Sequence, residues 1–222
     1  MSDLGPIYAI TDPLLLPGER LFDAAAQALT AGVKAIQLRD KSASAAQLET
    51  LGHRLVDLCN QFGAHCIIND RVEIALACGA HGVHLGQGDG SVPKARRLLG
   101  GNAIIGVTCH SDIALARRAK DEGASYVAFG RFYSSNTKPL AGAANIEVLQ
   151  QAAAEIGLPI VAIGGIRRDN MAPLLKAGAQ TLAVCHSLFG TDDVSTAAAD
   201  LLAAYQQCRG EPPRTSHPTD YE

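Results

Sequence analysis

The chain of 222 residues is 47% hydrophobic and 18% charged, which supplies enough apolar surface for a substantial core and excludes wholesale disorder. Its formal net charge of −3 gives no reason to expect nucleic acid or an acidic membrane as the main partner, so local clusters of basic residues must bind any anion. No apolar run approaches the roughly 20 residues that a membrane-spanning helix needs.

The amino-terminal residues and the cysteines predict a cytoplasmic location. Residues 1–12 contain no basic segment followed by an apolar core, so no secretory signal is expected. The six cysteines lack metal-binding spacing, and most stand inside apolar runs, where small buried thiols are typical of a reducing compartment. We therefore expect a soluble cytoplasmic domain.

A repeated junction organises the chain: a helical pattern ends at glycine, and a run rich in β-branched residues follows. Glycine suits the left-handed backbone position that ends a helix, so each junction predicts a helix followed by a strand. The junctions are Gly32, Gly63, Gly79, Gly100–Gly101, Gly123, Gly157 and Gly178. With the first apolar run they predict eight strands, at Ile7–Thr11, Val33–Leu38, Cys66–Ile68, Val83–Leu85, Ala103–Val107, Tyr126–Phe129, Pro159–Ile163 and Thr181–Val184.

The predicted strands are short continuous apolar runs, as is typical of parallel strands covered by helices. Eight helices are expected, at Arg20–Thr30, Ala45–Gln61, Arg71–Ala77, Val92–Leu99, Asp112–Glu122, Ile146–Ile156, Asn170–Lys176 and Val194–Gln207. Eight regular units favour an α/β fold, a single closed (β/α)8 TIM barrel over residues 1–208, with an open doubly wound sheet as the alternative. Residues 209–222 are proline-rich and predict a disordered tail.

Polar residues gather where the predicted strands end, which is where barrels carry their chemistry. Gln37, Arg39 and Lys41 alternate at the end of the second strand, so they point to the same side. A cationic pair inside the barrel mouth is costly to desolvate without a balancing anion, which favours an anion site. The alternative is that Asp40 and Glu49 neutralise the pair at the surface.

Asp70 and Asp89 follow adjacent strands and are candidate metal ligands. Hard carboxylate oxygens suit Mg²⁺, which commonly keeps several waters and bridges substrate phosphates. The alternative for Asp70 is a helix N-cap, because Glu73 stands three residues later. The alternative for Asp89 is an ordinary turn with Gly90. Spacing alone leaves these alternatives open.

The last two strands suggest a phosphate site. Gly164–Gly165 and the backbone of Cys185 and His186 stand where barrels commonly bind phosphate through backbone N–H groups, although a glycine pair also fits a tight turn. Residues 134–145 have the composition of a flexible lid, and Lys138 within it is a third candidate cation.

The sequence pattern assigns no catalytic role to three further residues near the strand ends. His84 is expected to be a packed, hydrogen-bonded residue rather than a general base. His110 is ambiguous. Nothing near Cys109 favours a reactive thiolate.

These segments together resemble the thiamine-phosphate synthase family, also called thiamine-phosphate pyrophosphorylases. The matching segments are YAITD, QLRDK, IIND, HLGQGD, IGVTCH, NTK and VAIGGI, in family order over residues 7–190. The resemblance implies a (β/α)8 barrel that joins hydroxymethylpyrimidine diphosphate to a thiazole phosphate and releases pyrophosphate with Mg²⁺. It also implies small phosphorylated molecules as partners rather than nucleic acid or membrane; it leaves the oligomeric state open, a homo-oligomer included.

The resemblance assigns roles to the residues above. Arg39, Lys41, Thr108 and Lys138 would carry catalysis. The pyrimidine diphosphate would be bound by Gln37, Arg39, Lys41, Asn69, Thr108 and Lys138. The thiazole phosphate would be bound by Ser135, Asn136, Thr137, Gly165, Cys185 and His186. Asp70 and Asp89 would hold Mg²⁺.

The sequence departs from the family pattern on the thiazole side. Ser134 replaces a frequent proline, Arg131 replaces a small residue or proline, and Cys185–His186 replaces a frequent Ile-Ser. Two rival functions therefore stay open: a thiazole tautomerase of the same superfamily, and a non-catalytic phosphate-binding regulator. Retention of the diphosphate-binding residues favours the synthase.

Overall fold

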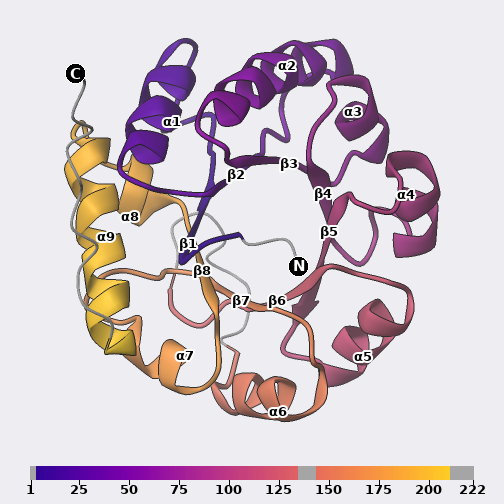
Figure 1. Cartoon of the computed structure of the whole chain (residues 1–222), viewed down its shortest axis with the longest axis vertical. Coiled ribbons are helices and arrows are strands. Elements are labelled where there is room, and N and C mark those ends of the chain that lie inside the picture. The colour runs from indigo at the N-terminus through magenta and orange to yellow at the C-terminus, as the bar shows by residue number, and fades with distance from the viewer. Residues whose placement is uncertain (1–3, 135–143, 211–222) are drawn as a thin grey trace, which may run out of the picture.

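Eight parallel strands pair in chain order and close on themselves, with β1 next to β8 (Figure 1). The computed structural model describes residues 4–134 and 144–210. The strands are β1 Ile7–Ile10, β2 Ala35–Leu38, β3 His65–Asn69, β4 Gly82–Leu85, β5 Ile104–His110, β6 Tyr126–Gly130, β7 Ile160–Ile163 and β8 Thr181–Val184. Because Tyr8 lies in parallel register with Ala183, the sheet has no free edge. The TIM barrel is confirmed, and the open doubly wound sheet is wrong.

Helices follow the strands and surround the barrel (Figure 1). They are α1 Arg20–Thr30, α2 Ala45–Gln61, α3 Val72–Ala77, α4 Val92–Leu99, α5 Ile113–Asp121, α6 Glu147–Glu155, α7 Ala172–Lys176, α8 His186–Phe189 and α9 Val194–Arg209. In the described part of the chain, no helix has the length and apolar character needed to cross a membrane. The predicted tail lies outside the described residues from position 211 onward.

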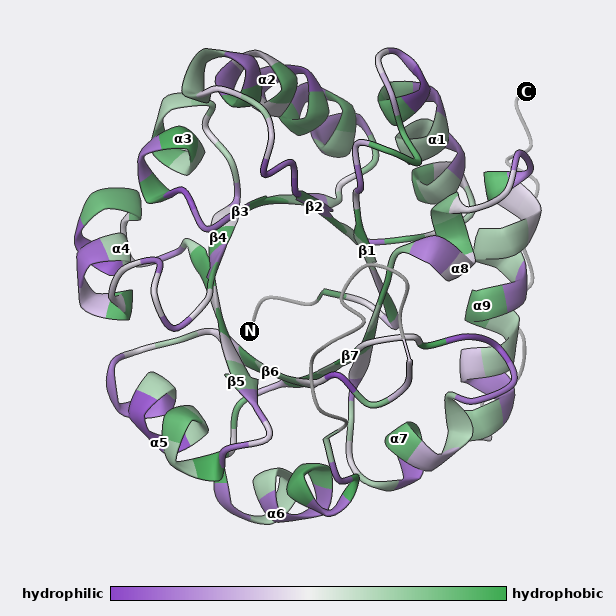
Figure 2. Cartoon of the chain, turned by 180° about the vertical axis from the view of Figure 1, so that it is seen from behind, coloured by the Kyte–Doolittle hydropathy of each residue, from purple (hydrophilic) through white to green (hydrophobic). Residues whose placement is uncertain are grey.

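Most residues of the strands are buried, which explains their continuous apolar sequences (Figure 2). In β2, Ile36 and Leu38 belong to the large core between strands and helices. Ala35, one residue away, belongs to a separate core inside the barrel that includes Tyr8 and Tyr126. Alternation along each strand therefore decides which side chains fill the barrel and which hold the helices.

The junction glycines end helices as predicted. Gly63 follows α2 with φ of 57°, and Gly79 follows α3 with φ of 65°, a left-handed conformation that side chains resist. At the start of α2, Ser44 and Gln47 form a reciprocal capping box, which satisfies two N–H groups that the helix leaves unpaired.

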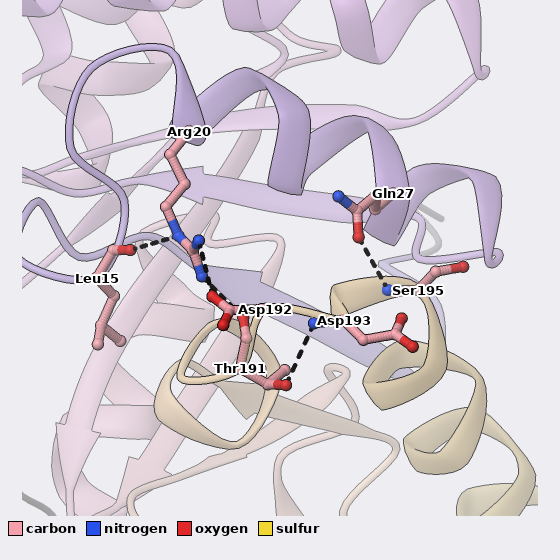
Figure 3. A network of polar contacts seen from close by, with 7 residues as sticks. All are labelled: Leu15, Arg20, Gln27, Thr191, Asp192, Asp193 and Ser195. Carbon is pink, nitrogen blue, oxygen red and sulfur yellow. Dashed lines mark hydrogen bonds and ion pairs between the residues drawn. The ribbon is translucent and has the colours of Figure 1, made fainter.

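Arg20 connects the first helix to the segment that follows the last strand (Figure 3). Its guanidinium donates to the Leu15 carbonyl at 3.1 Å, the Thr191 carbonyl at 2.9 Å and the Asp192 carboxylate at 3.1 Å. Nearby, the Ser195 N–H donates to the Gln27 side chain at 3.3 Å. The contacts with Thr191, Asp192 and Ser195 join residues about 170 positions apart and support closure of the barrel.

Arg96 performs a related task at the amino-terminal end of the strands. Its guanidinium donates to the carbonyls of Gly100, Gly101 and Ala103 beyond the end of α4. It also donates to the Gly123 carbonyl and the Ser125 hydroxyl before β6. The Arg96 side chain thereby connects the segment that precedes β5 to the segment that precedes β6.

The structure differs from the predicted elements at two places near the barrel mouth. β5 extends to His110 and shifts register against β6 between Thr108 and His110. The short helix α8 at His186–Phe189 was not predicted, because four residues are too few to show helical periodicity.

Candidate active site

The carboxyl ends of the strands bring residues that are far apart in sequence to one mouth. Gln37 lies on β2, Asn69 ends β3 and Thr108 lies on β5. Arg39 and Asp70 follow β2 and β3 directly. Because all strands are parallel, these residues meet at the same end of the barrel, where TIM barrels carry their active sites.

Asp70 and Asp89 form an acidic pair. Burial raises the pKa of the Asp89 carboxyl, and hydrogen bonding and repulsion from Asp70 raise it further. The Gly86 N–H donates to Asp89 Oδ2 at 3.0 Å and holds this carboxylate in its loop. A bound cation would stabilise the charged form of a carboxyl whose pKa is raised by a neighbouring carboxylate, so the chemistry of this pair fits a hard metal ion.

The helix-cap alternative for Asp70 is wrong. Arg71 is the N-cap residue of α3, and no side chain caps that helix. Asp70 has φ of 63°, and its N–H donates to the His84 carbonyl at 2.8 Å. This left-handed conformation directs the carboxylate to the mouth instead of the helix, and such strain is common at functional sites.

The acidic pair is not part of a larger ligand cluster. Among residues 4–134 and 144–210, no group of three or more acidic, histidine or cysteine side chains is placed to hold a metal ion. Water and substrate oxygens would complete the shell of a Mg²⁺ ion held by Asp70 and Asp89, which is the usual arrangement for this metal.

Lys41 supplies positive charge beside the acidic pair. The Lys41 ammonium lies 3.1 Å from Asp70 Oδ2, with 60% of the Lys41 side chain exposed. Surface pairing with Asp40 or Glu49 is therefore wrong for Lys41. Asp40 instead closes its own turn: burial opposes its ionisation, but hydrogen bonds from Ser42 and from the Ala43 N–H lower its pKa.

Arg39 has a different environment from Lys41. Within the described residues its guanidinium makes no ion pair or side-chain hydrogen bond. Burial raises the pKa of the Cys185 thiol to about 11, Asp12 adds to this rise, and Arg39 opposes it. Arg39 therefore lies near the end of β8, with its donors available to an anion in the mouth.

A chain of polar side chains crosses the barrel interior. Gln37 Nε2 lies 2.8 Å from the Tyr8 hydroxyl, and the Tyr8 and Tyr126 hydroxyls are 3.1 Å apart. His84 contacts the Tyr126 hydroxyl through Nδ1 and the Thr108 hydroxyl through Nε2, both at 2.8 Å. The prediction that His84 is packed and hydrogen-bonded is confirmed.

The end of β5 is irregular where Thr108 stands. The register shift exposes the Thr108 carbonyl to the side-chain amide of Gln87, which donates to it at 2.6 Å. The Gln87 oxygen in turn accepts from Arg118 at 2.8 Å. Burial raises the pKa of the neighbouring Cys109 thiol to about 12, which agrees with the prediction that Cys109 is no thiolate.

The glycine pair after β7 lies against the segment that leaves β6. A side chain at Gly164 would collide with Arg131, and one at Gly165 with the Ser134 carbonyl. The Tyr133 N–H donates to the Gly164 carbonyl at 3.0 Å. The pair therefore lets two backbone segments approach closely, and Arg131 is accommodated because Gly164 has no side chain.

Comparisons with known proteins now identify the family. The family model described as thiamine monophosphate synthase matches residues 7–188. The chain belongs to this thiamine monophosphate synthase family. It is 49% identical to a thiamine-phosphate synthase of Alcanivorax borkumensis over 209 residues, which cover 93% of this chain and 96% of the relative. It is 50% identical to one of Saccharophagus degradans over 197 residues, 88% and 91% of the two chains.

A solved structure agrees with these sequences. A thiamine phosphate pyrophosphorylase from Pyrococcus furiosus superposes with a TM-score of 0.82 at 32% identity, over 91% of this chain and 96% of that one. Accordingly, this member of the thiamine monophosphate synthase family is a transferase of thiamine biosynthesis.

The structure brings together most, but not all, of the residues that family resemblance implicates. The mouth collects Gln37, Arg39, Lys41, Asn69, Asp70, Asp89, Thr108, Gly165, Cys185 and His186. Cys185 is half-buried after β8, and His186 is exposed at the start of α8. Ser135, Asn136, Thr137 and Lys138 lie outside the described residues.

Sequence reasoning missed Tyr8, Tyr126 and Gln87. The two tyrosines stand in apolar runs and looked like ordinary core residues. Their hydroxyls offered one signal, since a buried tyrosine O–H usually needs a partner. Gln87 was part of a recognised motif, but the sequence could not show that its amide reaches the next strand.

Proposed function

We propose that the mouth of this barrel condenses 4-amino-2-methyl-5-hydroxymethylpyrimidine diphosphate with 4-methyl-5-(2-phosphooxyethyl)thiazole to give thiamine phosphate and pyrophosphate. The observation that carries this proposal is the acidic pair of Asp70 and Asp89 beside Lys41. Two carboxylates next to a lysine ammonium suit a magnesium diphosphate, because Asp70 and Asp89 would hold the metal and the metal would neutralise charge on the phosphate groups.

The pyrimidine diphosphate would lie across the ends of β2 to β5. Arg39 and Lys41 bind the phosphate oxygens, together with Thr108, Asn69 and, from the loop after β6, Lys138. Gln37 holds the pyrimidine ring from below. In support, Arg39 makes no ion pair within the described residues, and a guanidinium recognises phosphate with charge-assisted hydrogen bonds.

Magnesium held by Asp70 and Asp89 would neutralise charge on the diphosphate. The reaction begins when the bond between the pyrimidine methylene and the bridging oxygen breaks, and its electron pair leaves with pyrophosphate. Arg39, Lys41 and Lys138 stabilise the negative charge that grows on the leaving group, an effect larger in the transition state than in the ground state. The aminopyrimidine ring delocalises the positive charge left on the methylene.

The thiazole nitrogen then donates its lone pair to the methylene cation and forms the new C–N bond. No protein nucleophile is needed, and the raised thiol pKa values of Cys109 and Cys185 agree with this. The thiazole phosphate would be bound by Ser135, Asn136, Thr137, Gly165 and the backbone of Cys185 and His186. Holding both substrates together and excluding water supplies the remaining rate enhancement.

The cytoplasm is the proposed location of this chemistry. All six cysteines are free thiols, which fits a reducing compartment. Both substrates are small phosphorylated molecules, which are retained inside cells.

The decisive experiment measures pyrophosphate release from the two substrates with and without Mg²⁺. We expect release only when both substrates and the metal are present, with thiamine phosphate formed in equal amount. Isomerisation of a thiazole phosphate without condensation would instead support the tautomerase. Binding of thiazole phosphate without any turnover would support the regulator.

A further inference from the structure

The polar chain inside the barrel connects two residues at opposite sides of the proposed pyrimidine site. It runs from Gln37 through Tyr8, Tyr126 and His84 to Thr108, with successive contacts of 2.8, 3.1, 2.8 and 2.8 Å. Tyr8 and Tyr126 are each 1% exposed. Burial also raises the pKa of both phenols, so both keep their hydrogens throughout the physiological range.

The number of hydrogens limits how these contacts can be made. Each tyrosine and Thr108 contributes one O–H, and a neutral His84 contributes one N–H. A buried hydroxyl hydrogen without an acceptor is strongly unfavourable. If Tyr8 accepted from both Gln37 and Tyr126, its own hydrogen would have no acceptor in the described part of the chain.

Only two arrangements give every contact one donor and one acceptor and also leave no tyrosine hydrogen without an acceptor. In the first, Gln37 donates to Tyr8, Tyr8 to Tyr126, Tyr126 to His84 Nδ1, and His84 Nε2–H to Thr108. The Thr108 O–H is then free to donate into the mouth, and Gln37 presents its carbonyl oxygen. In the second, every direction is reversed: Thr108 presents a lone pair, and Gln37 presents its N–H₂ group.

The hydrogen-bonding roles of Gln37 and Thr108, at the two ends of this series of side chains, therefore cannot change independently. A phosphate oxygen on Thr108 requires a donor and selects the first arrangement. In that arrangement the carbonyl end of the Gln37 amide faces away from Tyr8, and it favours a donor beside it, such as an exocyclic amino group. Hydrogen-bond chains of this kind are also cooperative, because each bond polarises the next.

We propose that Tyr8, Tyr126 and His84 are positioning residues that couple recognition of the diphosphate at Thr108 to recognition of the pyrimidine amino group at Gln37. This inference rests on the proposed function for its two ligands. It assigns to the barrel interior a specificity that neither Gln37 nor Thr108 has alone: binding of the leaving group at Thr108 favours the amide orientation in which the Gln37 carbonyl oxygen accepts a hydrogen bond from the pyrimidine.

The test separates the substrate into its two halves and measures whether each strengthens the binding of the other. Calorimetric titration of pyrophosphate with Mg²⁺ is performed with and without saturating 4-amino-2-methyl-5-hydroxymethylpyrimidine. Couplings between ligand sites typically span 5- to 150-fold. We expect the pyrimidine alcohol to tighten pyrophosphate binding about tenfold in the wild type, and the analogue without the amino group to have no such effect.

Tyr126→Phe removes the central hydroxyl and keeps the ring that packs against Gly106. We expect both halves still to bind this variant, with the coupling reduced below about twofold. Tyr8→Phe interrupts the same chain elsewhere and provides a second test if Tyr126→Phe unfolds. Tyr205→Phe is the control, because it removes another buried hydroxyl, which donates to the Gln180 carbonyl far from the chain; it should keep the full coupling.

Two outcomes would overturn the inference while leaving the proposed function intact. One is binding of both halves to the wild type without coupling. The other is full coupling in folded Tyr126→Phe and Tyr8→Phe. Failure of the wild type to bind either half would instead overturn the proposed site, and this inference with it.

Discussion

The two ends of the barrel use arginine in opposite ways. At the amino-terminal end, the Arg96 guanidinium donates to four backbone carbonyls and the Ser125 hydroxyl. At the mouth, Arg39 has no ion pair or side-chain hydrogen bond within the described residues. The first arginine is satisfied by the fold, and for the second we propose a ligand. This difference is the one expected when a TIM barrel separates stability from catalysis.

The carboxylates show the same contrast. Asp112 caps the start of α5 by accepting from the Ala114 N–H at 2.7 Å and stabilises the fold. Asp70 and Asp89 instead stand together at the mouth, where Asp70 disfavours ionisation of Asp89. The mouth thus holds charge arrangements that folding alone does not favour, which is the usual signature of a functional site.

The largest effect on activity is expected from substitutions that break the acidic pair. Asp70→Asn and Asp89→Asn should each reduce kcat/KM at saturating Mg²⁺ by about 100-fold or more, because the transition state loses a metal ligand. Thermal unfolding without Mg²⁺ should show equal or greater stability, since repulsion is relieved. Unchanged turnover in both variants would sink the metal assignment.

The next prediction compares Arg39 with Arg96 by replacing each of them with methionine. Arg39→Met should lower kcat/KM by about 100-fold, because a charge-assisted contact to the leaving group is lost. Its free energy of unfolding should stay within about 0.5 kcal/mol of the wild type, since the guanidinium makes no ion pair or side-chain hydrogen bond within the described residues. Steady-state kinetics and urea unfolding measure both quantities; a large loss of stability would contradict the assignment of Arg39 to a ligand.

Arg96→Met should give the opposite result. The carbonyls that it binds lose their donors, so we expect a loss of about 2–3 kcal/mol in the free energy of unfolding. Turnover per folded molecule should remain near the wild-type value, because the mouth is untouched. Equal damage to activity and stability would show that the two ends are not independent.

A smaller effect is expected from Gln87. Gln87→Leu leaves the Thr108 carbonyl and the Arg118 guanidinium without their shared partner and should displace Thr108. We expect kcat/KM for the pyrimidine diphosphate to fall about tenfold, as small misplacements in active sites commonly do. Arg118→Met keeps the bond from Gln87 to Thr108 and is the matched control, with a smaller loss. Equal activity of both variants with the wild type would exclude this positioning role.

The smallest effect is a pH dependence. Because the pKa of Asp89 is raised in the folded protein, the folded state holds this proton more tightly than the unfolded chain. Asp89 therefore lowers stability at neutral pH, and this loss vanishes as the pH falls through the raised pKa. Urea unfolding without Mg²⁺ should show Asp89→Asn more stable than wild type at pH 7, with the difference shrinking toward pH 4. A difference that grows instead would contradict the raised pKa.

Much of this protein follows from the sequence alone. The glycine junctions and apolar runs predict every strand of the barrel to within a few residues, because helix ends and buried strands depend on local backbone preference and hydrophobicity. α1, α2 and α4 have the predicted bounds. The short helix α8 and the shifted end of β5 were missed, since both depend on neighbouring segments.

The sequence by itself also determined which residue types stand at the strand ends, and those residue types predict sites for anions and for a hard cation there. Only the tertiary structure decided how those residues pair: Lys41 with Asp70, Asp70 with Asp89, and Tyr8 with Tyr126 across 118 positions of sequence. Local patterns determine the elements, but closure of the sheet sets the register, and the register decides which inward side chains meet.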